Sequence, residues 1–264
     1  MTQNDPITTS ATSLAPHTTL QVGGPASQIV EAATEEEIIE QVQRFDDSDE
    51  PLLILGGGSN VVIAAGGWPG AALLIRSRGI EQADACGASE FTVAAGESWD
   101  DFVAQMVQEG YSGIEALSGV PGLVGATPIQ NVGAYGQEVS ETITRVRAWD
   151  RDDGRVVQLR NEDCGFSYRD SRFKRDPDRF VILGVTFGLR NSNVSSPIRY
   201  GQLANALGVG IGDRAPLQDT RDLVLQLRRE KGMVCDPADP DTRSAGSFFM
   251  NPILTTEQAE ALPD

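Results

Sequence analysis

The sequence predicts a globular protein of the α+β or the α/β class. Its 264 residues include 40% hydrophobic residues and 28 glycines, so the chain can bury a sizeable core in one to three domains. Strand-like and amphipathic helical segments follow one another along the chain. An uncharged, glycine-rich segment from Ser118 to Gly136 interrupts them, since its glycines and prolines disfavour a regular helix or strand.

Composition and charge exclude several classes of function. The formal net charge of −17 opposes non-specific binding to nucleic acid. No apolar run is long enough to cross a bilayer, and residues 1–13 lack the features of a secretory signal, so we expect no membrane insertion. Three distant cysteines (Cys86, Cys164 and Cys235) predict a reducing cytoplasm without disulfides. With His17 as the single histidine, we expect no metal site. We also expect the protein to be a monomer.

The N-terminal part predicts a tail, a strand and a helix. Residues 1–16 have the composition of a flexible tail, and the ordered chain is expected from His17 onward. Ile29 and Val30 suit a short strand. A capping box at residues 34–37 begins a helix with acidic residues in its first turn. The apolar side of this helix carries Ile38, Ile39, Val42 and Phe45.

A buried strand at residues 51–55 leads into the sequence Gly-Gly-Gly-Ser-Asn at 56–60. A second strand is expected at 61–63. Glycines after a strand can bring backbone amides up to a phosphate, but a tight hairpin between two strands is an equally good interpretation. The segment is not a P-loop because no Lys-Ser/Thr follows, and Val61 stands where the third glycine of a dinucleotide fingerprint belongs.

The middle of the chain alternates strands and one helix. Strands are expected at 71–75 and 91–95, and Ser98 caps a helix that Gly110 ends. The core side of this helix carries Phe102, Val103, Met106 and Val107.

After the glycine-rich segment, the sequence predicts a hairpin and a long strand. The hairpin joins residues 144–149 and 156–159 around a turn at 152–154, and the strand covers 180–189. A linker is expected at 191–197.

A helix beginning at Asp219 or Thr220 follows the linker. It ends at Lys231-Gly232.

The segment Ser118–Gly136 is the best candidate for a ligand-binding region. No charged residue occurs from Ala116 to Gln137, and apolar residues are interleaved with the glycines. Disorder is therefore not expected. We interpret the segment as backbone folded closely against a ligand, with amides left accessible because few side chains cover them.

Single residues elsewhere could carry chemistry, but each also has a structural interpretation. Arg169 lies between an aromatic residue and an acid, as in a solvated surface turn. Arg228 and Lys231 lie at a helix C-terminus, where cations suit the helix dipole. Ser247 is not in a nucleophile elbow and could be a turn residue before a strand.

Five motifs in one order resemble a known family. They are Gly56–Asn60, Gly119–Gly136, Ser167–Lys174, Arg199–Gly201 and Ala245–Pro252. Together they resemble UDP-N-acetylenolpyruvoylglucosamine reductase, the FAD enzyme of peptidoglycan precursor synthesis, over residues 17 to about 255.

The resemblance implies a vanillyl-alcohol-oxidase (PCMH)-type FAD-binding fold of the α+β class. Two FAD-binding subdomains, 17–78 and 79–190, would precede an incomplete α+β substrate domain at 198–264. FAD would lie with its diphosphate on the amides of the glycine loop and its isoalloxazine near Thr127, Asn131 and Tyr135. The residues implied to bind it are Gly56, Gly57, Gly58, Ser59, Asn60, Ser118, Gly119, Pro121, Gly122, Gly125, Ala126, Thr127, Asn131, Gly133, Ala134, Tyr135 and Gly136.

The resemblance also implies an activity. NADPH would reduce FAD, and the flavin would pass hydride to the enolpyruvyl ether of UDP-N-acetylglucosamine, giving UDP-N-acetylmuramate. Arg169 matches the family's arginine for the enolpyruvyl carboxylate, and Ser247 matches its proton donor. Residues implied to bind this UDP-sugar are Tyr200, Arg228, Lys231 and Asn251.

The sequence departs from the family pattern at its C-terminal end. Family members continue for about a hundred residues more, as the resemblance implies, and include a glutamate that assists proton transfer. Glu257 and Glu260 are expected to be solvated and not to replace it, and Met250 stands where Lys or Thr is common. Two alternatives therefore stay open: a non-catalytic FAD-binding fragment, and a flavin oxidase of the same fold.

Overall fold

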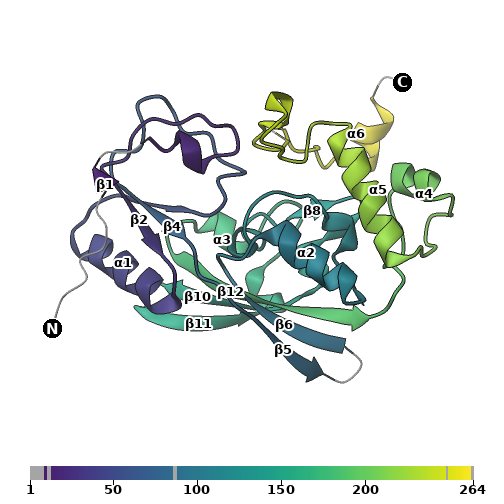
Figure 1. Cartoon of the computed structure of the whole chain (residues 1–264), viewed down its shortest axis with the longest axis horizontal. Coiled ribbons are helices and arrows are strands. Elements are labelled where there is room, and N and C mark those ends of the chain that lie inside the picture. The colour runs from purple at the N-terminus through teal and green to yellow at the C-terminus, as the bar shows by residue number, and fades with distance from the viewer. Residues whose placement is uncertain (1–8, 11–12, 86–87, 248, 263–264) are drawn as a thin grey trace.

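The computed structural model describes residues 9–10, 13–85, 88–247 and 249–262. Two sheets and a group of C-terminal helices make up the fold (Figure 1). In Figure 1, α1 (Glu35–Asp47) lies at one end of the molecule, and α4 (Gly201–Leu207), α5 (Leu217–Arg229) and α6 (Thr256–Glu260) lie together at the other.

The first sheet has the strand order β1-β2-β4-β3. Its strands are β1 (Thr9–Ser10), β2 (Gln28–Ala32), β3 (Leu52–Leu55) and β4 (Ala71–Ile75). β2, β4 and β3 are parallel, and β1 is antiparallel to β2. The carboxyl ends of the three parallel strands therefore share one edge, the usual place for a ligand in such sheets.

The second sheet is antiparallel and has the order β11-β10-β12-β6-β5, with β7 paired to one end of β12. Its strands are β5 (Ile80–Ala85), β6 (Ala88–Ala94), β7 (Tyr111–Ser112), β10 (Ile143–Asp150), β11 (Arg155–Arg160) and β12 (Phe180–Asn191). The predicted boundary at residues 78 and 79 falls between β4 and β5.

Shorter elements connect the sheets. They are α2 (Trp99–Gln108), α3 (Arg172–Arg175), the small hairpin of β8 (Gly133–Ala134) and β9 (Gln137–Glu138), and the 3-10 turns Ala15–His17, Glu115–Leu117, Val124–Ala126, Val139–Glu141, Asn161–Cys164 and Pro240–Thr242. The segment 118–136 contains only one such turn and the two residues of β8, as its glycines and prolines predict.

Three apolar clusters stabilise the two sheets, and a fourth lies among the C-terminal helices. The largest packs α2 against β6, β10 and β12 around Trp99, Phe102 and Phe187. Another joins α1 and the first sheet to Trp149 and Leu183 of the second, so the two sheets share part of one core.

The predicted helix starts at Thr34 and Ser98 are confirmed. The Thr34 hydroxyl accepts from the Glu37 amide, and the Ser98 hydroxyl accepts from the Asp101 amide. The predicted hairpin 144–159 and the long strand from Phe180 are also confirmed, as β10, β11 and β12. These elements were predictable because their signals are local in sequence.

The strand predicted at 61–63 is wrong. This stretch has no regular structure, although Val61 and Ile63 pack on the apolar cluster around Leu14 and Leu55. Its neighbour is the loop at Gly23–Gly24, where the Gly24 amide donates to the Ala64 carbonyl. The apolar residues of this stretch are explained by the partial burial of Val61 and Ile63, and the stretch is not paired with a strand.

Two other boundaries differ from the predictions. Leu14 is fully buried against the first sheet, and Thr9–Ser10 pairs with β2, so these residues of the predicted tail already belong to the fold; residues 1–8 and 11–12 lie outside the described part. α5 begins at Leu217, because the Thr220 hydroxyl donates back to the Pro216 carbonyl and so lies inside the first turn. β5, β7 and α4 were not predicted from the sequence.

None of the helices in the described part of the chain is long and apolar enough to cross a membrane.

Candidate active site

Two glycine-rich loops contact each other where β3 ends. The Ser59 hydroxyl donates to the Pro121 carbonyl at 3.1 Å, and the Asn60 amide group donates to the Gln130 side chain. A Cβ on Gly57 would lie 2.8 Å from the Gly122 α-carbon. The two loops can approach this closely only because both positions lack a side chain.

The Gly56–Asn60 loop keeps its backbone amides available. Among the hydrogen bonds between described residues, none uses the amide of Gly56, Gly57, Gly58, Ser59 or Asn60 as the donor. Gly56 and Gly57 line a cavity of about 270 Å³. Its other lining residues are Pro16, His17, Thr18, Thr19 and Arg76. Consecutive amides without acceptors beside a polar cavity fit the diphosphate of a dinucleotide cofactor.

Arg76 contributes a cation to this cavity, and the sequence analysis did not predict it. The residue directly follows β4, so it lies at the edge that also carries the Gly56–Asn60 loop. Its guanidinium is 3.5 Å from Glu31, an exposed partner. Only the parallel pairing of β3 with β4 brings Arg76 beside Gly56, and no local signal in the sequence marks that pairing.

Asn131 joins the glycine-rich segment to the Arg169 turn. Its side-chain nitrogen donates to the Ser167 carbonyl at 2.9 Å and to Glu138 at 2.8 Å, and its side-chain oxygen accepts from the Ser140 amide. The side chain is 1% exposed and fully used by the protein. Asn131 thus shapes the site and has little capacity left for a ligand.

Arg169 lies against the same segment. Its guanidinium donates to the Gly133 carbonyl at 2.5 Å, and its backbone has φ +55, uncommon for a residue with a side chain. The Lys174 ammonium donates to the Arg169 carbonyl at 2.8 Å and closes the turn. A cation is therefore fixed beside the backbone of β8, as the candidate role of Arg169 requires.

Tyr135, which directly follows β8, forms a second group with Tyr200 and Lys231. The two tyrosine rings meet edge to face at 5.3 Å, and the Lys231 ammonium lies 5.8 Å from the Tyr135 ring centre. Burial raises the pKa of Tyr135, and the Arg228 charge opposes that rise. These three predicted residues come together although they lie far apart in the sequence.

Arg228 is buried beside the glycine-rich segment. It is 9% exposed, and its Nε atom has no hydrogen-bond partner among the described residues. A second nitrogen donates to the Met233 carbonyl at 2.9 Å. Burial lowers the pKa of Arg228. The unpaired Nε atom is itself buried, so Arg228 could act on an anion bound nearby through its charge more than through this donor.

Ser247 and Asn251 do not join this group. Both are exposed, and no hydrogen bond within the described residues connects either side chain to Arg169 or Lys231. The nearby Ser244 carbonyl accepts from the Thr19 hydroxyl, so the segment preceding Ser247 contacts the loop that lines the cavity. Phe248, part of the predicted serine motif, lies outside the described residues.

Other predicted cofactor residues hold the segment itself. The Ser118 hydroxyl donates to the Glu115 carbonyl, the Thr127 hydroxyl donates to the Val124 carbonyl, and a Cβ on Gly125 would lie 2.6 Å from that of Ala95. Gly58 packs against the His17 carbonyl. Of the remaining predicted positions, Ala126 ends the 3-10 turn Val124–Ala126, Ala134 lies in β8, and a Cβ on Gly136 would lie 2.9 Å from that of Arg199.

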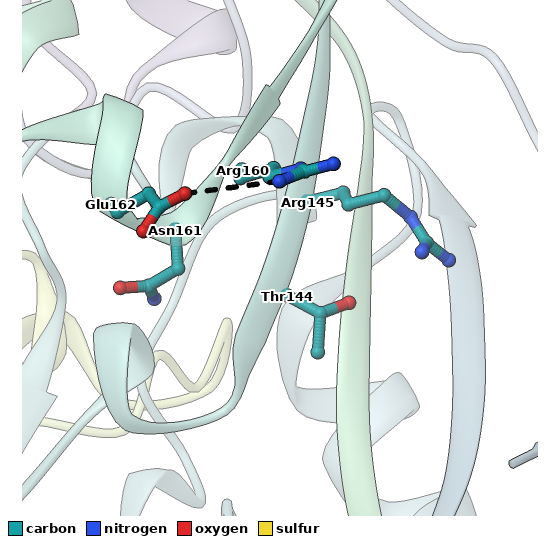
Figure 2. Close-up of a pocket in the computed structure, with 5 residues that line it drawn as sticks. All are labelled: Thr144, Arg145, Arg160, Asn161 and Glu162. Atoms are coloured by element: carbon teal, nitrogen blue, oxygen red, sulfur yellow. Dashed lines mark ion pairs between the residues drawn. The ribbon is translucent and has the colours of Figure 1, made fainter.

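A separate pocket of about 400 Å³ lies at β10 and β11, lined by Thr144, Arg145, Arg160, Asn161 and Glu162 (Figure 2). Its charges are compensated: Arg145 pairs with Glu90, and Arg160 lies 3.9 Å from Glu162. Within the described part of the chain, no group of three or more His, Cys, Asp or Glu side chains could hold a metal ion.

Comparison with known proteins identifies the class of the fold. Residues 26–160 match the family described as FAD binding domain. The reductase from Thermus caldophilus, UDP-N-acetylenolpyruvylglucosamine reductase (MurB), superposes with a TM-score of 0.65 and 24% identity over 93% of this chain and 76% of that one. A cholesterol oxidase from Brevibacterium sterolicum gives 0.53 and 11% identity, over 74% of this chain and 40% of that one. The fold is the vanillyl-alcohol-oxidase (PCMH)-type FAD-binding fold.

Sequence relatives identify the family. A UDP-N-acetylenolpyruvoylglucosamine reductase from Streptomyces coelicolor is 54% identical over 94% of this chain, which spans 64% of that relative's length. The Salinispora arenicola protein of the same name is 51% identical over 94% of this chain, which spans 69% of its length. The chain belongs to the UDP-N-acetylenolpyruvoylglucosamine reductase family, and the predicted resemblance is confirmed.

Proposed function

We propose that this chain catalyses the NADPH-dependent, FAD-mediated reduction of the enolpyruvyl ether of UDP-N-acetylglucosamine to UDP-N-acetylmuramate. The relatives carry the name of this reaction's enzyme. One observation in the structure carries the proposal: the segment 118–136 connects the cavity lined by Gly56 and Gly57 with the guanidinium of Arg169. A cofactor extended along the segment would meet the amides with its diphosphate and Arg169 near its reactive ring.

The residues present fit FAD at the diphosphate end. The free amides of Gly56–Asn60 would donate to its phosphate oxygens, and Arg76 would supply the positive charge. In a protein of net charge −17, a local cation is needed to offset the unfavourable overall field. Gly122 and Pro121 would support the loop from the other side.

At the other end, three cations surround the place expected for the substrate. When bound, FAD supplies the transfer of hydride from NADPH to the enolpyruvyl double bond. Arg169 would stabilise the charge that develops on the substrate carboxylate. Lys231 would bind the nucleotide diphosphate, the charge of Arg228 would support this binding, and Tyr200 would cover it.

Ser247 would donate a proton to the carbon next to the carboxylate. Ser247 and Asn251 are both exposed, so a bound substrate could reach their side chains. The contact between Thr19 and the Ser244 carbonyl holds the start of the segment 244–251 beside the cavity.

An anaerobic two-step experiment tests the proposal. NADPH is added to the FAD-loaded 264-residue chain, followed by the enolpyruvyl UDP-sugar. The expected result is loss and then return of the oxidised flavin absorbance. A chain that binds no FAD, or whose reduced flavin does not respond to the substrate, would contradict the proposed activity.

A second function is favoured by the exposed C-terminal segment. Met250 and Ile253 are 61% and 83% exposed, and no described contact brings Ser247 to the site. The alternative is a non-catalytic FAD-binding unit in which residues 17–190 are the stable part. Limited proteolysis separates the two, since only this alternative leaves a resistant core ending near Asn191. Rapid oxidation of the reduced flavin by oxygen would instead indicate a flavin oxidase.

We also infer that the chain acts in the cytoplasm as a monomer, without a nucleic-acid partner. A UDP-sugar substrate and cysteines that are free thiols at 164 and 235 support a cytoplasmic site of action. The net charge of −17 supports the absence of nucleic-acid binding.

A further inference from the structure

One ion pair joins α2 to the C-terminal helices. The two terminal nitrogens of Arg221 on α5 donate to the two carboxylate oxygens of Asp100 on α2, at 2.7 and 3.0 Å. The Arg221 side chain is 10% exposed and the Asp100 side chain 33%, so the pair is shielded from water mainly on the Arg221 side. A two-point contact between a planar guanidinium and a carboxylate fixes orientation as well as distance.

The same carboxylate holds the glycine-rich segment. The Gly119 amide donates to Asp100 at 2.6 Å. Gly119 has φ +71, and a Cβ there would lie 2.8 Å from Leu225 and 3.3 Å from the Nε atom of Arg228. α5 therefore packs directly on the backbone of Gly119. The Asp100 carboxylate accepts hydrogen bonds from both sides of this contact, from α5 and from the Gly119 amide.

The pair is charged at neutral pH. Burial alone would raise the pKa of Asp100, but the hydrogen bonds from Arg221 and Gly119 and the charges of Arg221 and Arg228 outweigh burial and lower it. Loss of Asp100 would leave the Arg221 charge buried without its carboxylate partner, whereas Asp100, whose side chain is 33% exposed, would keep the Gly119 amide and some contact with water. Asp100 and Arg221 thus act as one unit.

The face of α5 that meets Gly119 also carries a proposed substrate residue. Arg221, Leu225 and Arg228 are spaced by four and three residues, so they lie along one side of the helix. Anchoring the first of them fixes the direction in which the last one enters the site. Lys231 follows in the turn after α5.

We propose that Asp100 is a positioning residue, which places Arg228 and Lys231 against the cofactor-facing segment by binding Arg221 and the Gly119 amide together. This inference rests on the proposed function, because that function assigns Arg228 and Lys231 to the nucleotide diphosphate. In this role Asp100 acts through Arg221 and Gly119 and is not itself a ligand-binding residue.

The test uses Asp100→Asn, Arg221→Gln and the double variant, with Arg221→Lys as a partial rescue. UDP-N-acetylglucosamine is the binding probe, and hydrogen exchange of α5 and Gly119 is followed at the same temperature, well below unfolding. Each single variant is expected to weaken probe binding roughly tenfold, about the effect of one charge-assisted hydrogen bond. The double variant is expected to be no weaker than either single variant, because the pair is one unit.

Arg147→Gln is the matched control. Arg147 on β10 makes a two-nitrogen pair with Glu35 on α1, and α1 lies at the opposite end of the molecule from α5 in Figure 1. This variant should leave probe binding and α5 exchange unchanged. If Asp100→Asn speeds exchange in α5 but leaves probe affinity intact, the positioning role is overturned and the pair only stabilises the fold.

Failure of the proposed function would look different. If the unaltered chain does not bind UDP-N-acetylglucosamine, the proposed function is contradicted and the positioning role falls with it, whereas binding that is insensitive to Asp100→Asn overturns the positioning role alone. Arg221→Gln keeps the carboxylate that accepts from Gly119. Faster exchange at Gly119 in this variant supports coupling through Asp100, and unchanged exchange overturns it.

Discussion

The guanidinium of Arg169 donates to the backbone carbonyl of Gly133, so a cation is fixed to the backbone of the glycine-rich segment. Lys174 holds the Arg169 carbonyl from the other side of the turn. The positive charge therefore has a defined place before any substrate arrives, which reduces the reorganisation that a reaction at this place would need.

Replacing Arg169 should separate the two half-reactions. Arg169→Ala is expected to slow oxidation of the reduced flavin by substrate about 10²–10³-fold, the usual effect of losing one group that stabilises developing charge. Arg169→Lys should lose less, because lysine keeps the charge without the planar fork. Stopped-flow absorbance measures both steps, and equal slowing of the NADPH step would contradict the role.

Ser247→Ala should leave flavin reduction by NADPH unchanged and slow the substrate step by about 10²-fold or more, as expected for loss of a proton donor. Ser244→Ala tests the loop separately, since the Ser244 hydroxyl accepts from the Gly246 amide at 3.0 Å while its contact with Thr19 uses the backbone carbonyl. An unchanged substrate step in Ser247→Ala would assign the proton to another donor.

Gly57→Ala should disrupt the contact between the two loops. The added methyl group would lie 2.8 Å from the Gly122 α-carbon, so the loops must separate. We expect weaker FAD binding and a lower unfolding temperature, with a cost of about 1–3 kcal/mol as for other overpacked sites. Gly66→Ala is the control, because a Cβ there meets nothing within 4 Å. Similar FAD affinity in both variants would refute the loop contact.

Arg76→Gln should weaken FAD binding about tenfold, the size of one hydrogen bond to a charged group. The difference in FAD affinity between the variant and the unaltered protein should be smaller at high salt, because salt screens the attraction between Arg76 and the cofactor in the unaltered protein. Arg78→Gln is the control: Arg78 lies two residues further on and pairs with Glu97 at 3.0 Å, outside the cavity. Fluorescence titration of FAD measures both, and equal affinities would remove Arg76 from the site.

Cys164 should resist alkylation in the folded protein. Burial raises the pKa of its thiol to about 12, so almost no thiolate forms at pH 8. Cys235 is exposed and should react faster. Because the folded pKa is raised, the stabilisation from keeping Cys164 protonated is present below the unfolded pKa of about 8.5 and is lost as pH rises toward 12. Peptide mass spectrometry after iodoacetamide treatment resolves the two sites.

Local signals allowed most elements to be predicted, and long-range contacts account for the misses. Thr34 and Ser98 were found because a helix cap lies within three residues of its partner. Arg76 was missed because only the pairing of β3 with β4 brings it to Gly56. The Asp100–Arg221 pair joins residues 121 positions apart, and no spacing rule predicts such a contact.

The residues predicted for the site also divide into those that a motif could identify and those whose contacts depend on distant parts of the chain. Gly57, Gly122 and Arg169 were predicted through motifs, and the structure brings their loops together around the segment 118–136. The motifs could not show that the polar groups of Asn131 and Thr127 are used internally, since that depends on where Ser167 and Val124 lie.

The position of β12 has a consequence for synthesis of the chain on the ribosome. β12 lies between β10 and β6, although it is the last strand of its sheet to be translated. Until residue 191 has left the exit tunnel, β6 and β10 lack their common partner and expose unpaired edges. The first sheet, complete by Ile75, can form while translation continues, whereas the second must wait. Nascent chains arrested before Phe180 are therefore expected to need chaperones, and those arrested well beyond Asn191 are not.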